Sequence, residues 1–216
     1  MTEEDNEEKE SKVESVNIVG EIYKIEGKNW TEEFKLIDRD KDEHIVISNS
    51  DVSEKFMEDG LVYRIIGDKE DEKITLNDYE VLADDWEAYE EKKAKEKEKQ
   101  QINNTIEDRV AGKYEDTDIQ KVEINDNLGT DEEGDYIVLV HLKWNRKNKP
   151  KTTKDMLEMY SDDLAATLAE EENITETTVF GEVPYHLEGD NIAKMNYTRS
   201  GEKMAIGERW YDPIIR

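Results

Sequence analysis

The strongest constraint on the fold of this chain is its excess of acidic over basic residues. The 216 residues include 57 Asp and Glu against 30 Lys and Arg, a formal charge of −27. Charged residues make up 40% of the chain and the hydrophobic set only 35%, a composition that approaches that of disordered proteins. The apolar residues gather in short strand-like runs. We therefore expect small ordered cores joined by solvated, charged segments.

The same charge excludes several functional classes. A chain this negative repels phosphate backbones and anionic membranes, so we expect no nucleic-acid partner. The sequence shows no apolar stretch long enough to span a bilayer and no signal-peptide core. It contains no cysteine, which excludes disulfides, thiolate catalysis and Cys-ligated zinc.

Residues 1–15 form an acidic leader that has too few apolar side chains for a core. One interpretation is a disordered tail of a cytosolic protein. The other is a spacer that follows a signal peptide and a lipid-bearing cysteine encoded upstream. The composition fits both interpretations.

Residues 16–83 have the pattern of five short strands with one helix between the third and the fourth. Gly20 suits a sharply coiled first strand, and Gly60 suits the left-handed position after a helix. This order predicts an OB-like five-stranded β-barrel, with an SH3-like barrel as the alternative that the helix disfavours. The strands are expected at residues 16–25, 33–37, 44–47, 61–66 and 73–82, and the helix at residues 52–58.

Residues 84–112 have the composition of a charged helical linker. Residues 85–100 contain no Gly or Pro and mix Glu with Lys at helical spacings, which favours a solvated helix. Ile102, Ile106 and Val110 then recur every four residues. This stripe is predicted to pack on the domain that follows.

Residues 113–216 have the pattern of an α+β domain, a mostly antiparallel sheet with one packed helix. The apolar strand Tyr136–Trp144 is predicted to be central, with both faces covered. Thr152 or Thr153 is expected to cap a helix over residues 154–170, and Ser200-Gly201 to turn a hairpin. The other strands are expected at residues 119–124, 178–186, 193–198 and 203–210. The apolar stripe of the helix consists of Leu157, Tyr160, Leu164 and Leu168.

One stretch resembles the start of a calcium-binding loop. Asp38, Asp40 and Asp42 place carboxylates at the first, third and fifth positions of an EF-hand pattern. The sixth position, which requires Gly, is Glu43, and the twelfth, which requires Glu, is Asn49. We therefore interpret Asp38–Glu43 as a polar hairpin turn.

No motif predicts catalysis or a bound cofactor. The chain has no nucleophile elbow, no dinucleotide-binding glycine pattern and no phosphate-binding loop. His141 and His186 could lie on neighbouring strands near Glu182, but partly buried, hydrogen-bonded histidines are expected instead of metal ligands. The pair Asp162-Asp163 is expected to be a solvated part of the helix. We expect a protein that is not an enzyme and has no catalytic, cofactor-binding or metal-binding residue.

The basic residues gather at one place in the sequence, which we call the basic cluster. It lies at the end of the Tyr136–Trp144 strand and the start of the next helix. It is either a partner-binding patch for an acidic partner or wall polymer, or a local counterweight to the surrounding acids. Its members are Lys143, Arg146, Lys147, Lys149, Lys151 and Lys154.

Three stretches, Tyr136–Trp144, Thr152–Ala166 and Val179–His186, resemble an uncharacterised domain of secreted lipoproteins from low-GC Gram-positive bacteria. The resemblance covers about residues 115–212, and the preceding barrel segment resembles OB-type domains attached to such lipoproteins. It implies a lipid anchor upstream and an extracellular or membrane-anchored location at the cell surface. It implies no catalytic residues.

These observations lead us to expect a non-enzymatic, extracytoplasmic binding or structural protein, monomeric and with a protein or cell-envelope partner. The alternative is a cytosolic acidic protein that mimics nucleic acid or inhibits a basic protein, because dense carboxylates can imitate the spacing of phosphates. A hydrolase without a recognisable motif ranks third.

Overall fold

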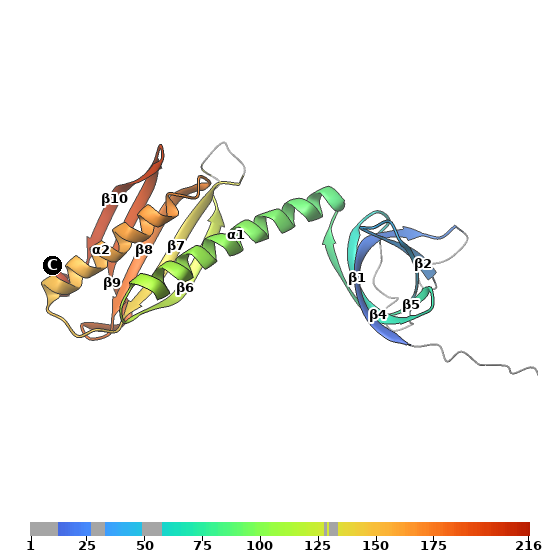
Figure 1. The fold of residues 1–216 in the computed structure, drawn as a ribbon, viewed down its shortest axis with the longest axis horizontal. Coiled ribbons are helices and arrows are strands. Elements are labelled where there is room, and N and C mark those ends of the chain that lie inside the picture. Colours follow the sequence, from blue (N-terminus) through green and yellow to red (C-terminus); the bar gives the residue numbers. More distant parts are fainter. Residues whose placement is uncertain (1–12, 27–32, 49–57, 128, 130–133) are drawn as a thin grey trace, which may run out of the picture. The chain divides into compact units, whose positions relative to one another are not determined.

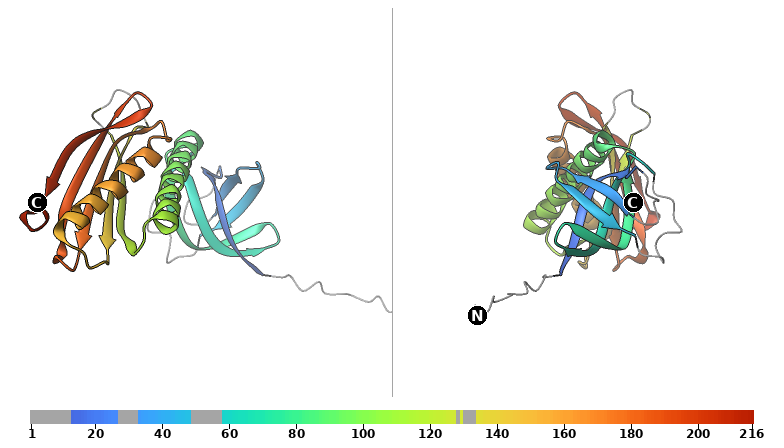
Figure 2. Two further views of the ribbon diagram at one scale, coloured as in Figure 1. Left: turned by 60° about the vertical axis from the view of Figure 1, so that its left-hand side comes forward. Right: turned by 90° about the vertical axis from the view of Figure 1, so that its right-hand side faces the viewer.

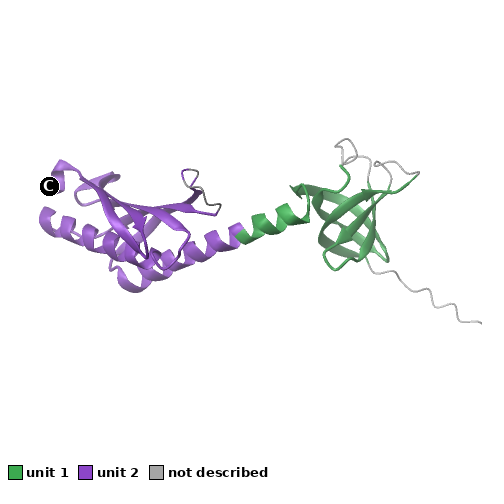
Figure 3. Cartoon of the chain, turned by 90° about the horizontal axis from the view of Figure 1, so that it is seen from above, with its two compact units in different colours: residues 1–94 green, residues 95–216 purple. Residues whose placement is uncertain are grey.

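The computed structural model describes residues 13–26, 33–48, 58–127, 129 and 134–216. Within these residues the chain forms ten strands in two sheets and two α-helices (Figure 1). It divides into two compact units, residues 1–94 and 95–216, which Figure 3 colours separately. The division falls inside helix α1 (Trp86–Lys113), so each unit includes part of that helix. The segment 84–112 was predicted as a linker separate from both domains.

Unit 1 contains a five-stranded sheet that closes on itself. Strand β1 pairs antiparallel with both β2 and β4, and β2 pairs antiparallel with β3. Strand β5 closes the sheet, because it pairs parallel with β3 and antiparallel with β4. The helix expected at residues 52–58 lies, except for Glu58, outside the described residues. The strands are β1 (Glu14–Lys24), β2 (Glu33–Asp38), β3 (Glu43–Ile47), β4 (Val62–Glu70) and β5 (Lys73–Ala83).

Two glycines of unit 1 occupy positions that other residues would strain. A Cβ atom placed on Gly20 would lie 2.6 Å from the carbonyl oxygen of Ile37, so β1 and β2 approach too closely there for any side chain. Gly60 has a φ of +83°, the left-handed conformation that glycine adopts without strain. Alternate strand residues such as Ile22 and Phe34 fill the interior of the sheet.

The stretch that resembles a calcium loop forms the turn between β2 and β3. One carboxylate oxygen of Asp38 accepts hydrogen bonds from the backbone amides of Asp40 and Asp42, at 3.0 and 2.9 Å. Its other oxygen lies 2.9 Å from Nε2 of the buried His44. The turn itself therefore engages both oxygens of Asp38, and the prediction of a polar hairpin turn is confirmed.

Unit 2 is a five-stranded sheet in the order β10-β9-β8-β7-β6. Three of its four strand pairs are antiparallel, but β7 and β8 run parallel. The expectation of a mostly antiparallel sheet is confirmed. The one parallel pair arises because helix α2 (Pro150–Leu168) carries the chain back to the end of the sheet at which β7 begins. The strands are β6 (Thr117–Asp126), β7 (Tyr136–Trp144), β8 (Ile174–Val183), β9 (Leu187–Ser200) and β10 (Lys203–Tyr211).

Both helical segments of unit 2 lie on the same face of this sheet (Figures 1 and 2). The predicted stripes of the two helices are confirmed, since Ile106 of α1 and Leu164 of α2 belong to one core with Val140 of β7. Within the described residues, no helix is long and apolar enough to cross a membrane.

The prediction that β7 is covered on both faces is wrong. Its residues alternate between buried and half-buried, because the helices cover one face only. On the other face the side chains shield one another: the ring of His141 stacks on Phe180, with ring centres 4.4 Å apart. This partial burial lowers the pKa of His141.

Candidate functional site

The basic cluster extends over the end of β7, the connecting segment and the first turns of α2. Two of its members pair with carboxylates from other parts of unit 2. Arg146 binds Glu115 at 2.9 Å, and the Nζ atom of Lys143 lies 3.7 Å from Glu182. These two cations therefore balance nearby acids.

Glu182 is the most buried carboxylate in this part of the structure, with 4% of its surface exposed. Burial acts to raise its pKa, but hydrogen bonds from the Gly189 amide and from Gln120, together with the nearby Lys143, outweigh that effect and leave the pKa below its ordinary value. Lys143 thus lies beside an ionised carboxylate that already accepts hydrogen bonds from two other groups. This arrangement is typical of a structural ion pair.

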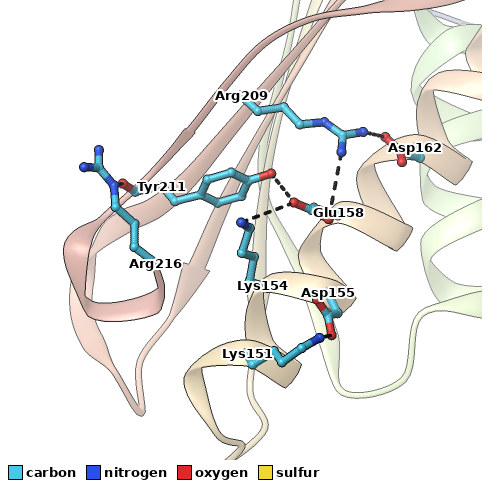
Figure 4. A network of polar contacts seen from close by, with 8 residues as sticks. All are labelled: Lys151, Lys154, Asp155, Glu158, Asp162, Arg209, Tyr211 and Arg216. Atoms are coloured by element: carbon cyan, nitrogen blue, oxygen red, sulfur yellow. Dashed lines mark hydrogen bonds and ion pairs between the residues drawn. The ribbon is translucent and has the colours of Figure 1, made fainter.

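Two further members of the basic cluster make polar contacts on α2, which Figure 4 shows. Lys151 contacts Asp155 at 2.6 Å, and this hydrogen bond raises the pKa of Lys151. Lys154 lies 4.0 Å from Glu158 and 4.5 Å from the ring centre of Tyr211. Both lysines are therefore engaged within the chain.

Lys147 and Lys149 differ from these four residues. Neither has a carboxylate partner among the residues that the structure describes. Both line an open hollow of about 690 Å³, which we call the lysine hollow. Its lining is Lys147, Asn148, Lys149, Pro150, Tyr185, His186 and Ile214.

Aromatic and aliphatic side chains complete the lysine hollow. Tyr185 is 52% exposed and Ile214 is 42% exposed, so both present apolar surface to solvent. The Nζ atom of Lys147 lies 4.9 Å from the centre of the Tyr185 ring, a cation–π contact. The hollow therefore combines two positive charges with apolar surface, in a chain that is otherwise strongly acidic.

The start of α2 adds to the positive potential of this hollow. Lys149 is the N-cap residue and makes no side-chain cap hydrogen bond, and the first turn contains no acidic residue. Helix N-termini carry a partial positive charge and usually recruit Asp, Ser or Thr to the cap. This helix instead has a cation at the position where an acidic or hydroxyl side chain would stabilise it.

The predicted cap at Thr152 or Thr153 is wrong, because Pro150 begins the helix earlier than expected. Thr153 is fully buried, and its hydroxyl lies 2.9 Å from Nε2 of His186. His186 is therefore partly buried and hydrogen-bonded, as expected, and the contact holds the β8–β9 turn against α2. That turn also carries Tyr185, so the same contact holds the aromatic ring of Tyr185 at the lysine hollow.

Other candidate residues are accounted for by contacts within unit 2. Asp162 accepts hydrogen bonds from Tyr197 and Arg209, both at 2.5 Å, and Asp163 forms a two-point ion pair with Arg109 of α1. The expectation that this pair is merely solvated is wrong. His141 contacts Phe180 whereas His186 contacts Thr153. No group of three His, Asp or Glu side chains within the described residues is arranged to hold a metal.

No protein-family model matches the chain, and no curated protein sequence matches it. The interpretation of the lysine hollow therefore rests on its geometry. Two cations, a helix N-terminus and an aromatic ring can hold an anionic group and the apolar part that carries it. Sequence reasoning identified both lysines but missed Tyr185 and Ile214, which follow Lys149 by more than thirty residues in the sequence and show no local signal.

Proposed function

We propose that this chain is a non-enzymatic binding protein that recognises an anionic cell-envelope polymer through the lysine hollow. The observation that carries the proposal is the pair Lys147 and Lys149, two cations without a carboxylate partner among the described residues and beside the exposed ring of Tyr185. In a chain of formal charge −27, most cations are expected to be neutralised by neighbouring acids. Two cations that no described carboxylate neutralises, gathered in one hollow, are suited to an external anion.

Two further parts of the proposal concern the fold and the location. We propose that the closed five-stranded sheet of unit 1 is an OB-type barrel, a type supported by its strand order β1-β2-β3-β5-β4 and by the parallel β3–β5 pair. We also propose a lipoprotein-type, extracytoplasmic location, which the resemblance of residues 115–212 to secreted lipoprotein domains supports. The location is tested by cell fractionation of the native host and by mass spectrometry of the N-terminus for a lipid-modified cysteine.

Binding is tested by calorimetric titration of the full chain with inorganic polyphosphate, a probe for phosphate-bearing polymers. The double variant Lys147→Glu/Lys149→Glu should lose binding by at least about tenfold, because each change reverses a charge that faces the ligand. The variant Lys151→Glu is the matched control, since it reverses a charge that is already paired with Asp155. Equal losses in both would contradict a site at the lysine hollow.

The density of carboxylates favours a second candidate function. A cytosolic acidic protein could imitate nucleic acid in the groove of a basic protein, since 57 carboxylates create a strong negative field. A cytosolic fraction without lipid modification, together with no binding of polyphosphate, would favour this candidate over the first.

A further inference from the structure

A second hollow of unit 2 shares no lining residue with the lysine hollow. It lies between α2 and the β9–β10 hairpin and has a volume of about 420 Å³. We call it the α2–β10 groove. Its lining is Asp162, Ala165, Ala166, Ala169, Tyr197, Glu202, Lys203, Met204 and Ile206.

The floor of the α2–β10 groove is apolar and open to solvent. The alanines of α2 are too short to fill the space beside β10, and Met204 and Ile206 line the opposite wall. Ile206 is 59% exposed, so most of its aliphatic side chain contacts solvent. The groove therefore offers apolar surface that no described part of the chain covers.

The rim of the groove is acidic at the end where α2 finishes. Glu170 and Glu172 line an adjoining hollow that shares Ala166, Ala169 and Glu202 with the groove. Glu170, Glu172 and Glu202 form no ion pair with any residue that the structure describes. The last turn of α2 also contains no basic residue, so the negative end of the helix dipole adds to the potential of these carboxylates.

One arginine, Arg199, also lines the adjoining hollow, and backbone carbonyl groups hold its guanidinium. The guanidinium of Arg199 donates hydrogen bonds to the carbonyl oxygens of Ile174 and Glu171, both at 2.6 Å, and to that of Ala169 at 3.3 Å. It thus satisfies carbonyl groups at and beyond the C-terminus of α2, where such groups have no partner within the helix. Lys203 is the one cationic residue among the described residues that line the groove itself, and Glu202 precedes it in the sequence.

We propose that the α2–β10 groove binds a basic segment of a partner protein. A large aliphatic or aromatic side chain of that segment lies on Ile206 and the alanines, and its flanking Lys or Arg residues contact Glu170, Glu172 and Glu202. Charge complementarity selects this occupant, because a second copy of the chain would bring another −27 charges to the same surface. The proposal is independent of the lysine hollow and of its anionic ligand.

The first test measures binding of the full chain to a short synthetic peptide that carries one central Trp between Lys and Arg residues. Fluorescence of that Trp would be complicated by the four native tryptophans, so a dye-labelled peptide and anisotropy are used. Saturable binding is expected, and replacing the peptide Trp by Ser should weaken it by at least about tenfold, as expected for the loss of a buried aromatic side chain. Equal binding of both peptides would overturn the proposal, because it would indicate charge attraction alone.

The second test fills the groove. Ala166→Leu places a larger side chain on the floor, at an exposed helical position that tolerates leucine, and it should weaken peptide binding by at least about tenfold. Ala111→Leu is the matched control, because Ala111 is also exposed and helical but lies on α1. Ile206→Ser serves as a second groove variant. If both groove variants fold and bind the basic peptide with unchanged affinity, the proposed site is overturned, whether or not the chain binds polyphosphate.

Discussion

At the scale of single residues, Lys149 shows a conflict between helix stability and charge. It occupies the N-cap of α2 without a side-chain cap hydrogen bond, although the dipole of the helix favours a negative group there. Local departures from the most stable choice concentrate at functional sites. The conflict therefore supports a role for Lys149 outside the stability of the fold.

We predict that Lys149→Asp stabilises the chain and weakens polyphosphate binding at the same time. The aspartate can accept a hydrogen bond from a free backbone amide of the first turn, which should raise the free energy of unfolding by about 1 kcal/mol. Urea unfolding and calorimetric titration measure the two effects. Lys149→Ala is the control and should weaken binding without this gain. A less stable Lys149→Asp variant would contradict the prediction.

Asp163 shows the opposite behaviour, a charge that the fold uses fully. The hydrogen bonds from Arg109, together with one from Tyr114, hold the pKa of Asp163 below its ordinary value against the effect of burial. A carboxyl group whose pKa is lower in the folded than in the unfolded state adds stability above the unfolded-state pKa. That stability is lost as the pH falls through the folded-state pKa.

We predict that Asp163→Asn lowers the melting temperature at neutral pH and that the difference from the unmodified chain shrinks below about pH 4. At low pH both chains lack the charge, so the ion pair with Arg109 contributes to neither. Thermal unfolding followed by circular dichroism over a pH series measures this. Asp155→Asn is the control, because the pair of Asp155 with Lys151 is exposed and such pairs contribute little. A pH-independent difference at Asp163 would argue against the assignment.

At the scale of elements, the periodic patterns of the sequence predicted most of the strands and both helical stripes. Leu164 and Ile106 were recognisable because burial on one face of a helix imposes a regular spacing. The cap at Thr152 or Thr153 was wrong because several residues near Pro150 could begin the helix, and only tertiary contacts assign Thr153 to His186. The parallel β7–β8 pair depends on the path of α2 across the sheet, which no local pattern encodes.

The basic cluster shows the same limit for the candidate site. Its six members were grouped by their proximity in the sequence, but the acids that neutralise Lys143 and Arg146 come from β8 and from the turn before β6. Without these contacts, Lys147 and Lys149, which pair with no described carboxylate, could not be separated from the paired cations. The place of Tyr185 in the lysine hollow could not be predicted either, because a turn brings this residue to the hollow from a distant part of the sequence.

Two glycine substitutions are predicted to have opposite effects in different elements. Gly20→Ala should lower the free energy of unfolding by about 1–3 kcal/mol, because the new methyl group would meet the backbone of Ile37 between β1 and β2. Gly112→Ala should raise it by up to about 1 kcal/mol, because the methyl group meets nothing within 4 Å and alanine favours the helix. Urea unfolding of the two variants measures both. A stabilised Gly20→Ala chain would show that β1 and β2 approach less closely than described.

At the scale of the whole molecule, the formal charge of −27 acts on every encounter with a charged partner. An anion that approaches the lysine hollow first experiences the repulsion of the entire chain, and only at short range the attraction of Lys147 and Lys149. Salt screens the long-range repulsion first, since the Debye length falls from about 30 Å at 0.01 M to about 8 Å at 0.15 M.

We therefore predict that the association rate of polyphosphate rises with salt over this range, although the same salt weakens the contacts made in the complex. The dissociation rate should rise as well, because the bound phosphate groups are held by two screened cations. Stopped-flow mixing of the full chain with a labelled polyphosphate measures both rates. For the basic peptide at the α2–β10 groove the association rate should instead fall with salt. Both the net negative charge of the chain and the carboxylates of the rim attract this peptide, and salt screens both attractions. An association rate that falls with salt for both ligands would mean that the local field of the lysines, and not the net charge, governs the encounter with the anion.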